Sequence, residues 1–401
     1  MGTLTLASDE LRVYEELCKA VEAGGDIAEV TYETIAIKYL SLAQTRESLL
    51  KSYNIVRQLS DKGYILADFD WSRIANVKTL ITLSALIMKG GGAKGLAYVG
   101  ALKELEKFFS FNWFAGTSAG AIAAVLLGAG YTSEELEEIL YEKDFREFFD
   151  AGIFQGSLNL MRYWGIFTGD TFVDWLDGLL AAKLRSASRV RLGDLPKRVT
   201  IYASCRDNDT LIFDSSNPRD AHKYAAFAVR CSMAIPIVFT SPSIEGMRVL
   251  DGGVRNNYPV EALLKDNPGI KFVGLYLGQR TYEGHARKDR ADWLLGDLWS
   301  LWTESTDRRA IEKYKAQTVI IDCRPIKTLN FKLSKVKKDF LIQAGRAAAL
   351  EYLATYVPES GIDKSVAVAA ATEVELKRKS LQSSWSWRKV VPFFLSLFVP
   401  W

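Results

Sequence analysis

The sequence predicts an α/β fold, a sandwich of helices on a mainly parallel β-sheet, preceded by a small helical domain. Two observations predict it. Short apolar runs without helical period alternate along the chain with segments whose apolar residues recur every three or four positions. The first such run, residues 80–88, is continuous and bounded by glycines, as expected of a buried parallel strand.

Length and composition set the limits of this fold. The 401 residues suffice for one large core and a small accessory domain, with 48% hydrophobic and 25% charged residues. The four cysteines are far apart and form no CxxC pair, which predicts neither a zinc site nor a disulfide framework. We find no secretory signal and no apolar stretch long enough to span a membrane, so we expect a cytoplasmic protein.

Residues 1–80 are expected to form a separate, winged-helix-like domain. Three helices, at 8–23, after Thr31 and at 45–59, precede a short hairpin at 64–71. In a winged helix-turn-helix the third helix would present these side chains: Thr45, Arg46, Ser48, Lys51 and Arg57. The alternative is a helical bundle used for docking or dimerisation. The domain lacks a strong basic excess and the net charge is only +3, so nucleic acid is an unlikely partner.

The following segment alternates strands and helices. After the first strand, Leu96, Val99, Leu102 and Leu105 mark one helical face. A second strand is expected at 111–115, followed by helices at 119–127 and 133–141. Further strands are expected at Arg198–Ala203, Leu211–Phe213, Ile237–Phe239, Ile270–Leu277 and Thr318–Asp322.

A glycine-rich turn connects the first strand to its helix. It consists of Gly90, Gly91, Gly92, Ala93, Lys94 and Gly95. Glycines at a helix start let successive backbone N–H groups turn toward an anion, and Lys94 adds a positive charge. A dinucleotide site is the alternative, but no acidic residue follows the next strand to hold a ribose.

The next strand ends instead in a GxSxG motif. It comprises Gly116, Thr117, Ser118, Ala119 and Gly120. Between a strand and a helix this motif is typical of a nucleophile elbow, in which glycines permit a tight turn and expose the serine hydroxyl. The preceding glycine turn can then supply an oxyanion hole. The alternative is a turn serine that caps a helix.

A serine nucleophile needs a base. The only histidines, His222 and His285, have polar neighbours and favour surface positions. The remaining candidate is Asp251, which ends a short apolar strand and is followed by Gly252 and Gly253. The alternative for Asp251 is an ordinary turn residue.

The glycine turn, the GxSxG motif and the Asp-Gly-Gly motif, in this order, resemble the patatin-like phospholipase family. The resemblance covers roughly residues 84–280 and extends to Cys231–Phe239 and to Asn256, Asn257 and Pro259. It implies a three-layer α/β/α patatin-like sandwich. It also implies a Ser-Asp dyad without histidine, with Ser118 as nucleophile and Asp251 as general base.

The resemblance implies further roles. The backbone of Gly91, Gly92 and Ala93 corresponds to the oxyanion hole, and Lys94 orients the loop or screens a phosphate. No cofactor is implied and no metal-ligand cluster appears, as in a calcium-independent hydrolase. The expected domains are 1–80, winged-helix-like; 81–280, catalytic core; 281–357, completing the core; and 358–401, a tail.

Two apolar segments are expected near the site. Residues 145–180 are rich in aromatics, of which most are expected in the core and some over an acyl pocket. A stripe at 293–302 is a candidate lid or docking face. From Leu376 onward the chain has no acidic residue, and its basic and aromatic residues favour an anionic membrane surface. The alternative is a tail that packs on the core or on a partner.

Together these features predict a phospholipase that releases fatty acids from membrane phospholipids through an acyl-enzyme intermediate. We expect it at the inner face of the cell membrane, with residues 1–80 as a regulatory or homo-oligomeric interface. Bacterial members of the family include toxins and anti-phage effectors, so antiviral defence by regulated membrane damage is an expected role. Two alternatives stay open: a DNA-linked regulator with a degenerate hydrolase domain, and a hydrolase of small esters.

Overall fold

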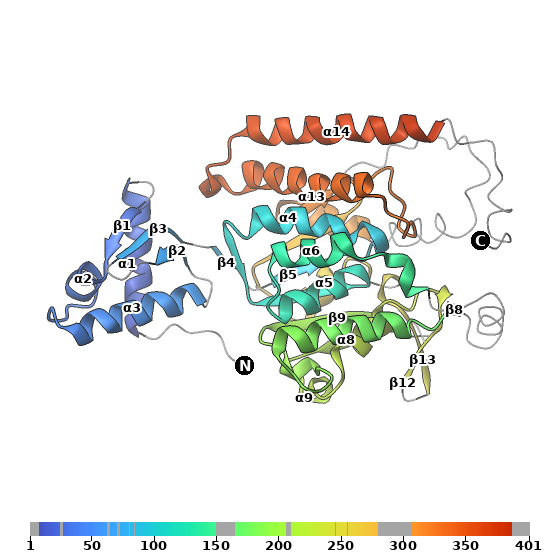
Figure 1. Cartoon of the computed structure of the whole chain (residues 1–401), viewed down its shortest axis with the longest axis horizontal. Coiled ribbons are helices and arrows are strands. Elements are labelled where there is room, and N and C mark those ends of the chain that lie inside the picture. The colour runs from blue at the N-terminus through green and yellow to red at the C-terminus, as the bar shows by residue number, and fades with distance from the viewer. Residues whose placement is uncertain are drawn as a thin grey trace. The chain divides into compact units, whose positions relative to one another are not determined.

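The chain divides into two compact units in a computed structural model: residues 1–84 with 106–111, and residues 85–105 with 112–401 (Figure 1). The structure describes residues 8–24, 27–61, 65–69, 73–79, 81–83, 85–149, 165–205, 210–244, 246–254, 256–279 and 307–386. His285, the stripe at 293–302 and the aromatic residues at 150–164 therefore lie outside the described residues.

The first unit combines helices with two small sheets. Its elements are α1 (Ser8–Gly24), β1 (Ile27–Thr31), α2 (Tyr32–Thr34), the π-helix η1 (Ile35–Tyr39), α3 (Arg46–Asp61), β2 (Ile65–Phe69), β3 (Arg73–Thr79), β4 (Ile81–Leu83) and β6 (Phe109–Phe111). Strands β1, β3 and β2 form an antiparallel sheet in that order, and β4 pairs with β6. Strand β1 was not expected, because its five residues are stabilised by pairing with β3, more than 40 positions away along the chain.

Helix α3 carries the side chains expected to face DNA, and the structure gives two of them local roles. The Thr45 hydroxyl accepts a hydrogen bond from the backbone of Ser48 (3.2 Å), which caps the helix. Lys51 forms an ion pair with Asp9 of α1 (2.6 Å). The opposite face of α3 packs into the core of this unit. That core includes Val13, Leu17, Ile35, Val56, Leu59 and Ile65, all fully buried.

The second unit contains an eight-stranded sheet. Its strands are β5 (Ala85–Met88), β7 (Trp113–Thr117), β9 (Arg198–Cys205), β10 (Thr210–Asp214), β12 (Ser243–Ile244), β13 (Met247–Asp251), β14 (Phe272–Leu277) and β15 (Thr318–Ile321). The order is β12-β13-β9-β7-β5-β14-β15, with β10 on β9. Strands β9, β7, β5, β14 and β15 are parallel, whereas β13 and β10 run antiparallel to β9.

The apolar run 80–88, expected as one strand, is divided between the two units. Its first part, β4, pairs with β6, whereas its second part, β5, lies in the central sheet. A uniform apolar run does not specify where pairing partners change. A further pair, β8 (Gly165–Phe167) with β11 (Ile237–Phe239), is parallel and separate from the central sheet.

Helices cover both faces of the central sheet. The helices that the structure describes in this unit are η2 (Gly92–Leu96), α4 (Ala97–Leu105), α5 (Ala119–Gly128), α6 (Ser133–Glu142), η3 (Phe145–Phe148), α8 (Asp170–Leu184), η4 (Leu192–Asp194), α9 (Pro218–Ala221), α10 (Ala225–Ser232), η5 (Gly252–Val254), α11 (Val260–Asp266), η6 (Lys315–Gln317), α13 (Lys335–Tyr356), η7 (Pro358–Ser360) and α14 (Lys364–Ser386). Ala85 and Ile87 of β5 pack with Val260 and Ile311 on one face, while α5 packs on the other. This is the three-layer α/β/α arrangement that the sequence predicts.

Helix α14 changes the expected boundary of the tail. It continues to Ser386 and packs along α13, which itself packs on α4 (Figure 1). Arg378, expected in a basic membrane segment, is buried and forms ion pairs with Asp322 (2.7 Å) and Glu375 (3.0 Å). Residues 376–386 are thus part of a packed helix, and 387–401 lie outside the described residues. No helix among the described residues is long and apolar enough to cross a membrane.

Helices α4 and α13 approach closely through two glycines. A Cβ atom on Gly345 would lie 1.8 Å from the carbonyl oxygen of Ala97, and one on Gly100 would lie 1.8 Å from that of Ile342. Backbone therefore contacts backbone at this crossing. Because neither carbonyl can move without its helix, any side chain here forces the helices apart.

We predict that Gly345→Ala lowers the free energy of unfolding by about 2 kcal/mol, although alanine is normally the better helix former. Urea unfolding measures the change. Gly178→Ala in α8 is the matched control, since nothing lies within 4 Å of its added Cβ. The control should be neutral or stabilising by up to about 1 kcal/mol. Equal effects of the two substitutions would contradict the close packing.

Candidate active site

Ser118 lies at the sharp turn between β7 and α5. Its backbone has φ of 52° and ψ of −117°, a conformation that side chains other than glycine rarely adopt. The turn depends on both flanking glycines. A Cβ on Gly116 would lie 2.3 Å from the backbone of Gly120, and one on Gly120 would lie 2.2 Å from the Met88 carbonyl oxygen. This is the geometry of a nucleophile elbow.

A buried hydroxyl holds the elbow in place. The backbone N–H of Ser118 donates to Ser232 Oγ (2.8 Å), and that hydroxyl donates to the Tyr202 carbonyl of β9 (2.6 Å). The hydroxyl of Thr117 donates to the Asn256 carbonyl (2.7 Å). Sequence reasoning did not single out Ser232 for this role, although it lies within the Cys231–Phe239 segment that carries the family resemblance.

Asp251 ends β13 at the same edge of the sheet and is 1% exposed. Its backbone N–H donates to the Ala234 carbonyl (2.9 Å), and its Oδ1 accepts from the Gly253 N–H (2.7 Å). A Cβ on Gly252 would lie 2.1 Å from the Tyr202 carbonyl oxygen, so only glycine fits there. The Asp-Gly-Gly motif thus places the carboxylate against β9.

The carboxyl group of Asp251 has a strongly perturbed acidity. Burial raises its pKa to about 7, although hydrogen bonding to Gly253 and to the Ser118 side chain opposes the shift. The Ser118 hydroxyl is close enough to lower this pKa, but Asp251 Oδ2 has no donor at ordinary hydrogen-bonding distance among the described residues. Such contacts are commonly long before substrate binds.

The glycine turn lies beside the elbow. A Cβ on Gly90 would lie 3.4 Å from the Ser118 Cβ, and one on Gly95 would lie 3.0 Å from the Ala119 Cβ. Gly92 has φ of 54°, and a Cβ there would lie 2.3 Å from the Thr328 carbonyl oxygen. The turn is therefore confined between the elbow and the segment that contains Thr328.

The hydrogen bonds of this turn distinguish its N–H groups. The Ala93 N–H, expected in the oxyanion hole, donates instead to the Thr328 carbonyl (3.0 Å), and the Gly90 N–H donates to the Asn257 carbonyl (2.9 Å). For Gly91 and Gly92 the structure gives no backbone acceptor within the described residues. Lys94 is half-buried. Burial raises the pKa of the Cys323 thiol to about 12, and the nearby positive charge of Lys94 opposes this rise.

A buried ion pair, which sequence reasoning missed, connects the residue before the glycine turn to the segment that follows Asp251. Lys89 and Asp307 are 4% and 3% exposed and lie 3.5 Å apart. Asp307 also accepts hydrogen bonds from the Tyr258 N–H (3.1 Å) and from Asn257 Nδ2 (3.4 Å). Burial raises the pKa of Asp307. The position of Lys89, directly after the apolar run 80–88, was the one sequence feature that could have indicated this ion pair. Asp307, more than 200 residues away, lies in no motif.

A narrow apolar cavity opens at Ser118. Its volume is about 60 Å³, and most of its wall is aliphatic or aromatic. Of the aromatic residues at 145–180, Phe145, Phe148 and Trp175 line it, whereas Phe172 is fully buried in the core. This cavity suits an acyl chain bound next to the hydroxyl.

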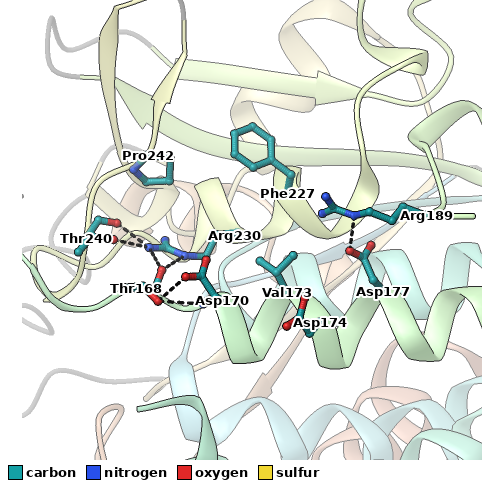
Figure 2. Close-up of a pocket in the computed structure, with 10 residues that line it drawn as sticks. All are labelled: Thr168, Asp170, Val173, Asp174, Asp177, Arg189, Phe227, Arg230, Thr240 and Pro242. Atoms are coloured by element: carbon teal, nitrogen blue, oxygen red, sulfur yellow. Dashed lines mark hydrogen bonds and ion pairs between the residues drawn. The ribbon is translucent and has the colours of Figure 1, made fainter. Parts of the chain in front are cut away.

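A second, larger cavity of about 630 Å³ lies on the other side of α8 and lacks both Ser118 and Asp251. Figure 2 shows Arg230 at one end, where it donates to the carbonyls of Thr168 and Thr240. Arg189 pairs with Asp177 at the other end (2.6 Å). Between these ends, Asp170 accepts a hydrogen bond from the Thr168 hydroxyl (2.7 Å).

Other candidate groups do not join the site. His222 is exposed at the end of α9, away from the lining of the apolar cavity. Among the described residues, no group of three His, Cys, Asp or Glu side chains is placed to hold a metal ion.

Comparison with known proteins extends these observations. Residues 86–264 match the model of the family described as patatin-like phospholipase. Protein YqhO of Bacillus subtilis is 33% identical over 282 residues, which cover 65% of this chain and 94% of YqhO. A probable lipid hydrolase, 463L of Invertebrate iridescent virus 6, is 24% identical over 52% of this chain and 68% of its own length.

Solved structures match as well. VipD from Legionella pneumophila matches 73% of this chain and 70% of its own, with a TM-score of 0.45 and 16% identity. The ExoU–SpcU complex from Pseudomonas aeruginosa matches 70% of this chain and 53% of its own, with a TM-score of 0.43 and 19% identity. From the family model and the relationship to YqhO, with the elbow and the aspartate strand end in place, this chain belongs to the patatin-like phospholipase family.

Proposed function

We propose that this protein is a lipid acyl-hydrolase in which Ser118 and Asp251 form a catalytic dyad. One observation carries the proposal: a serine at a strained elbow lies beside a buried carboxyl group whose pKa is raised to about 7, at the mouth of an apolar cavity. Aspartate with an ordinary pKa is a weak base. Burial makes this one a stronger base at neutral pH.

The reaction follows from the positions of these groups. Ser118 Oγ attacks the ester carbonyl while its proton moves to Asp251 Oδ2. The N–H groups of Gly91 and Gly92 are the proposed donors to the oxyanion, because the Ala93 N–H is engaged by Thr328. Asp251 then protonates the leaving alcohol, which leaves an acyl group on Ser118. Water, deprotonated by Asp251, hydrolyses that acyl-enzyme and releases a fatty acid.

The substrate class is proposed from the cavity and the family. An apolar cavity at the nucleophile fits an acyl chain, and the similar protein 463L is named a probable lipid hydrolase. We propose membrane phospholipids as substrates, reached from the cytoplasmic face. Residues 387–401, with Arg388 and Lys389 before an apolar, tryptophan-containing end, are the proposed membrane contact. Residues 1–80 contain none of the three motifs and are proposed to regulate the enzyme or to bind a partner.

We predict that Ser118→Ala and Asp251→Asn each lower kcat/KM for a p-nitrophenyl ester by at least about a thousandfold. A fluorophosphonate probe should label the wild-type protein and fail to label Ser118→Ala. The matched controls are Ser243→Ala and Asp266→Asn, both exposed positions, which should retain activity. Probe labelling that persists without Ser118, or turnover that persists without the Asp251 carboxylate, would contradict the dyad.

The pH dependence tests the role of Asp251. Because the base must be ionised, log kcat/KM should fall with a slope of one as the pH drops below about 7. Stability should change in the opposite direction. The folded state holds the Asp251 proton more tightly than the unfolded state, so wild-type stability falls as the pH rises from about 4 to 7.

Asp251→Asn, which cannot ionise, should therefore gain stability over the wild type at pH 8 and lose this advantage near pH 4. Thermal unfolding of both proteins at the two pH values measures the difference. An advantage that does not change with pH would show that Asp251 has an ordinary pKa.

Deletion of 387–401 should reduce hydrolysis of anionic phospholipid vesicles but not of a short soluble ester. The deletion removes two cations, Arg388 and Lys389, together with the aromatic end of the chain. Each cation contributes about 1 kcal/mol of binding near an anionic surface. Added salt should shrink the difference. The cut falls after α14, so the packed helix and its Arg378–Asp322 ion pair remain. Equal losses on both substrates would contradict a membrane role.

A further inference from the structure

Between β15 and the first turn of α13 the chain is strongly basic. Residues 323–338 contain no aspartate or glutamate. The chain as a whole has 51 basic and 48 acidic residues, so this stretch concentrates positive charge. Its six cationic side chains are Arg324, Lys327, Lys332, Lys335, Lys337 and Lys338.

This segment borders the apolar cavity at Ser118. It follows the carboxyl end of β15, and Ser118 follows that of the parallel strand β7, so both leave the sheet at the same edge. The carbonyl of Thr328 accepts the Ala93 N–H (3.0 Å), and Phe331 lines the cavity together with Ser118. The Phe331 ring also makes a T-shaped contact with that of Phe149, with centroids 5.1 Å apart. The segment is therefore fixed beside the proposed nucleophile.

Two of the six cations serve the fold. Arg324 pairs with Asp322 (2.5 Å). Lys338 is buried, and its ammonium donates to the carbonyls of Tyr141 and Lys143 (2.8 Å for the latter) at the end of α6. The other four form what we call the basic strip: Lys327, Lys332 and Lys335, which are exposed, and Lys337, which is half-buried.

The basic strip does not stabilise the helix into which it leads. Lys335 and Lys337 lie in the first turn of α13, where the helix dipole favours acidic side chains. Burial lowers the pKa of Lys337, and the charge of Lys332 lowers it further. Gathering positive charge here therefore destabilises the isolated protein, and an anionic partner would relieve the repulsion.

We infer that the basic strip docks the protein on an anionic lipid surface, with the apolar cavity turned toward the lipid. Cleavage of an ester there rests on the proposed function of Ser118. Val336 lies between two cations of the strip and is 63% exposed. It enters the interface while the neighbouring ammonium groups contact lipid phosphates. The strip acts in addition to residues 387–401.

Lipid fits this surface better than a nucleic acid does. The strip combines cations with an exposed aliphatic side chain, which gains nothing on a phosphodiester backbone but is buried at a membrane interface. The strip is also continuous with the apolar cavity through Phe331, so docked lipid lies beside Ser118.

Sedimentation with vesicles of phosphatidylglycerol and phosphatidylcholine tests the inference. All proteins carry Ser118→Ala, so binding is measured without hydrolysis. Lys332→Glu with Lys335→Glu should weaken binding at least about a hundredfold, because each cation near an anionic surface strengthens binding roughly fivefold and here two become anions. Val336→Asp should weaken binding about tenfold. High salt should remove the effect of the double variant.

Matched controls make the same changes elsewhere. Lys265→Glu with Lys271→Glu alters exposed positions shortly before β14, at the opposite edge of the sheet. Val368→Asp on α14 replaces a valine that is also 63% exposed. Both controls should bind within about threefold of the parent, since charges beyond a Debye length from the lipid are screened.

Thermal unfolding separates docking from folding. Lys335→Glu and Val336→Asp each place an acid in the first turn of α13, so these variants should unfold at the same temperature as the parent or higher. If the double variant does not fold, Val336→Asp decides the question.

The outcomes separate this inference from the proposed function. Equal binding by strip and control variants would overturn the docking surface, as would a parent that ignores anionic vesicles or binds duplex DNA more tightly than lipid. Ester hydrolysis that needs Ser118 would stand in each of these cases. If the wild type instead hydrolyses no ester while vesicle binding depends on the strip, the proposed function fails and the docking surface stands.

Discussion

The backbone of Ser118 is held in a conformation that L-residues rarely adopt, and the rest of the site depends on it. The strain persists because the surroundings leave no alternative. Glycines at 116 and 120 let α5 approach β5 and β7 until backbone touches backbone, and Ser232 accepts the hydrogen bond from the Ser118 N–H. The same turn sets the direction of α5 and hence of the cavity along it. The strained turn thus sets both the position of the Ser118 hydroxyl and the direction of the apolar cavity.

Burial of Asp251 lowers the stability of the folded protein and raises the basicity of its carboxylate. A carboxyl group that is 1% exposed beside a hydroxyl destabilises the folded protein at neutral pH, because its charged form is poorly solvated. The same loss of solvation raises its pKa to about 7, and in the proposed dyad this carboxylate accepts the serine proton without a histidine. A buried Asp-Gly-Gly strand end serves this purpose better than an exposed loop, which would leave the carboxylate solvated and weakly basic.

The glycine turn depends on groups from distant parts of the chain. Its flanking Lys89 pairs with Asp307, which also holds the backbone at Tyr258, and the Thr328 carbonyl engages the Ala93 N–H. Breaking a buried ion pair by removing one partner leaves an uncompensated charge and commonly costs 3–5 kcal/mol. The catalytic core therefore extends beyond its three motifs, into residues between β14 and α13 that carry no motif.

The sequence by itself determined the α/β class, the family and the candidate dyad. Each rests on short, contiguous segments whose backbone geometry permits few residue types. These segments are the apolar runs, the glycine turn, the GxSxG motif and the Asp-Gly-Gly motif. Only the tertiary structure decided which N–H groups of the turn remain available, that Asp307 and Ser232 support the site, that the run 80–88 is split, and that 376–386 packs as part of α14. These features arise from contacts between residues up to hundreds of positions apart, and burial and pairing at that range leave no periodic or compositional mark on the chain.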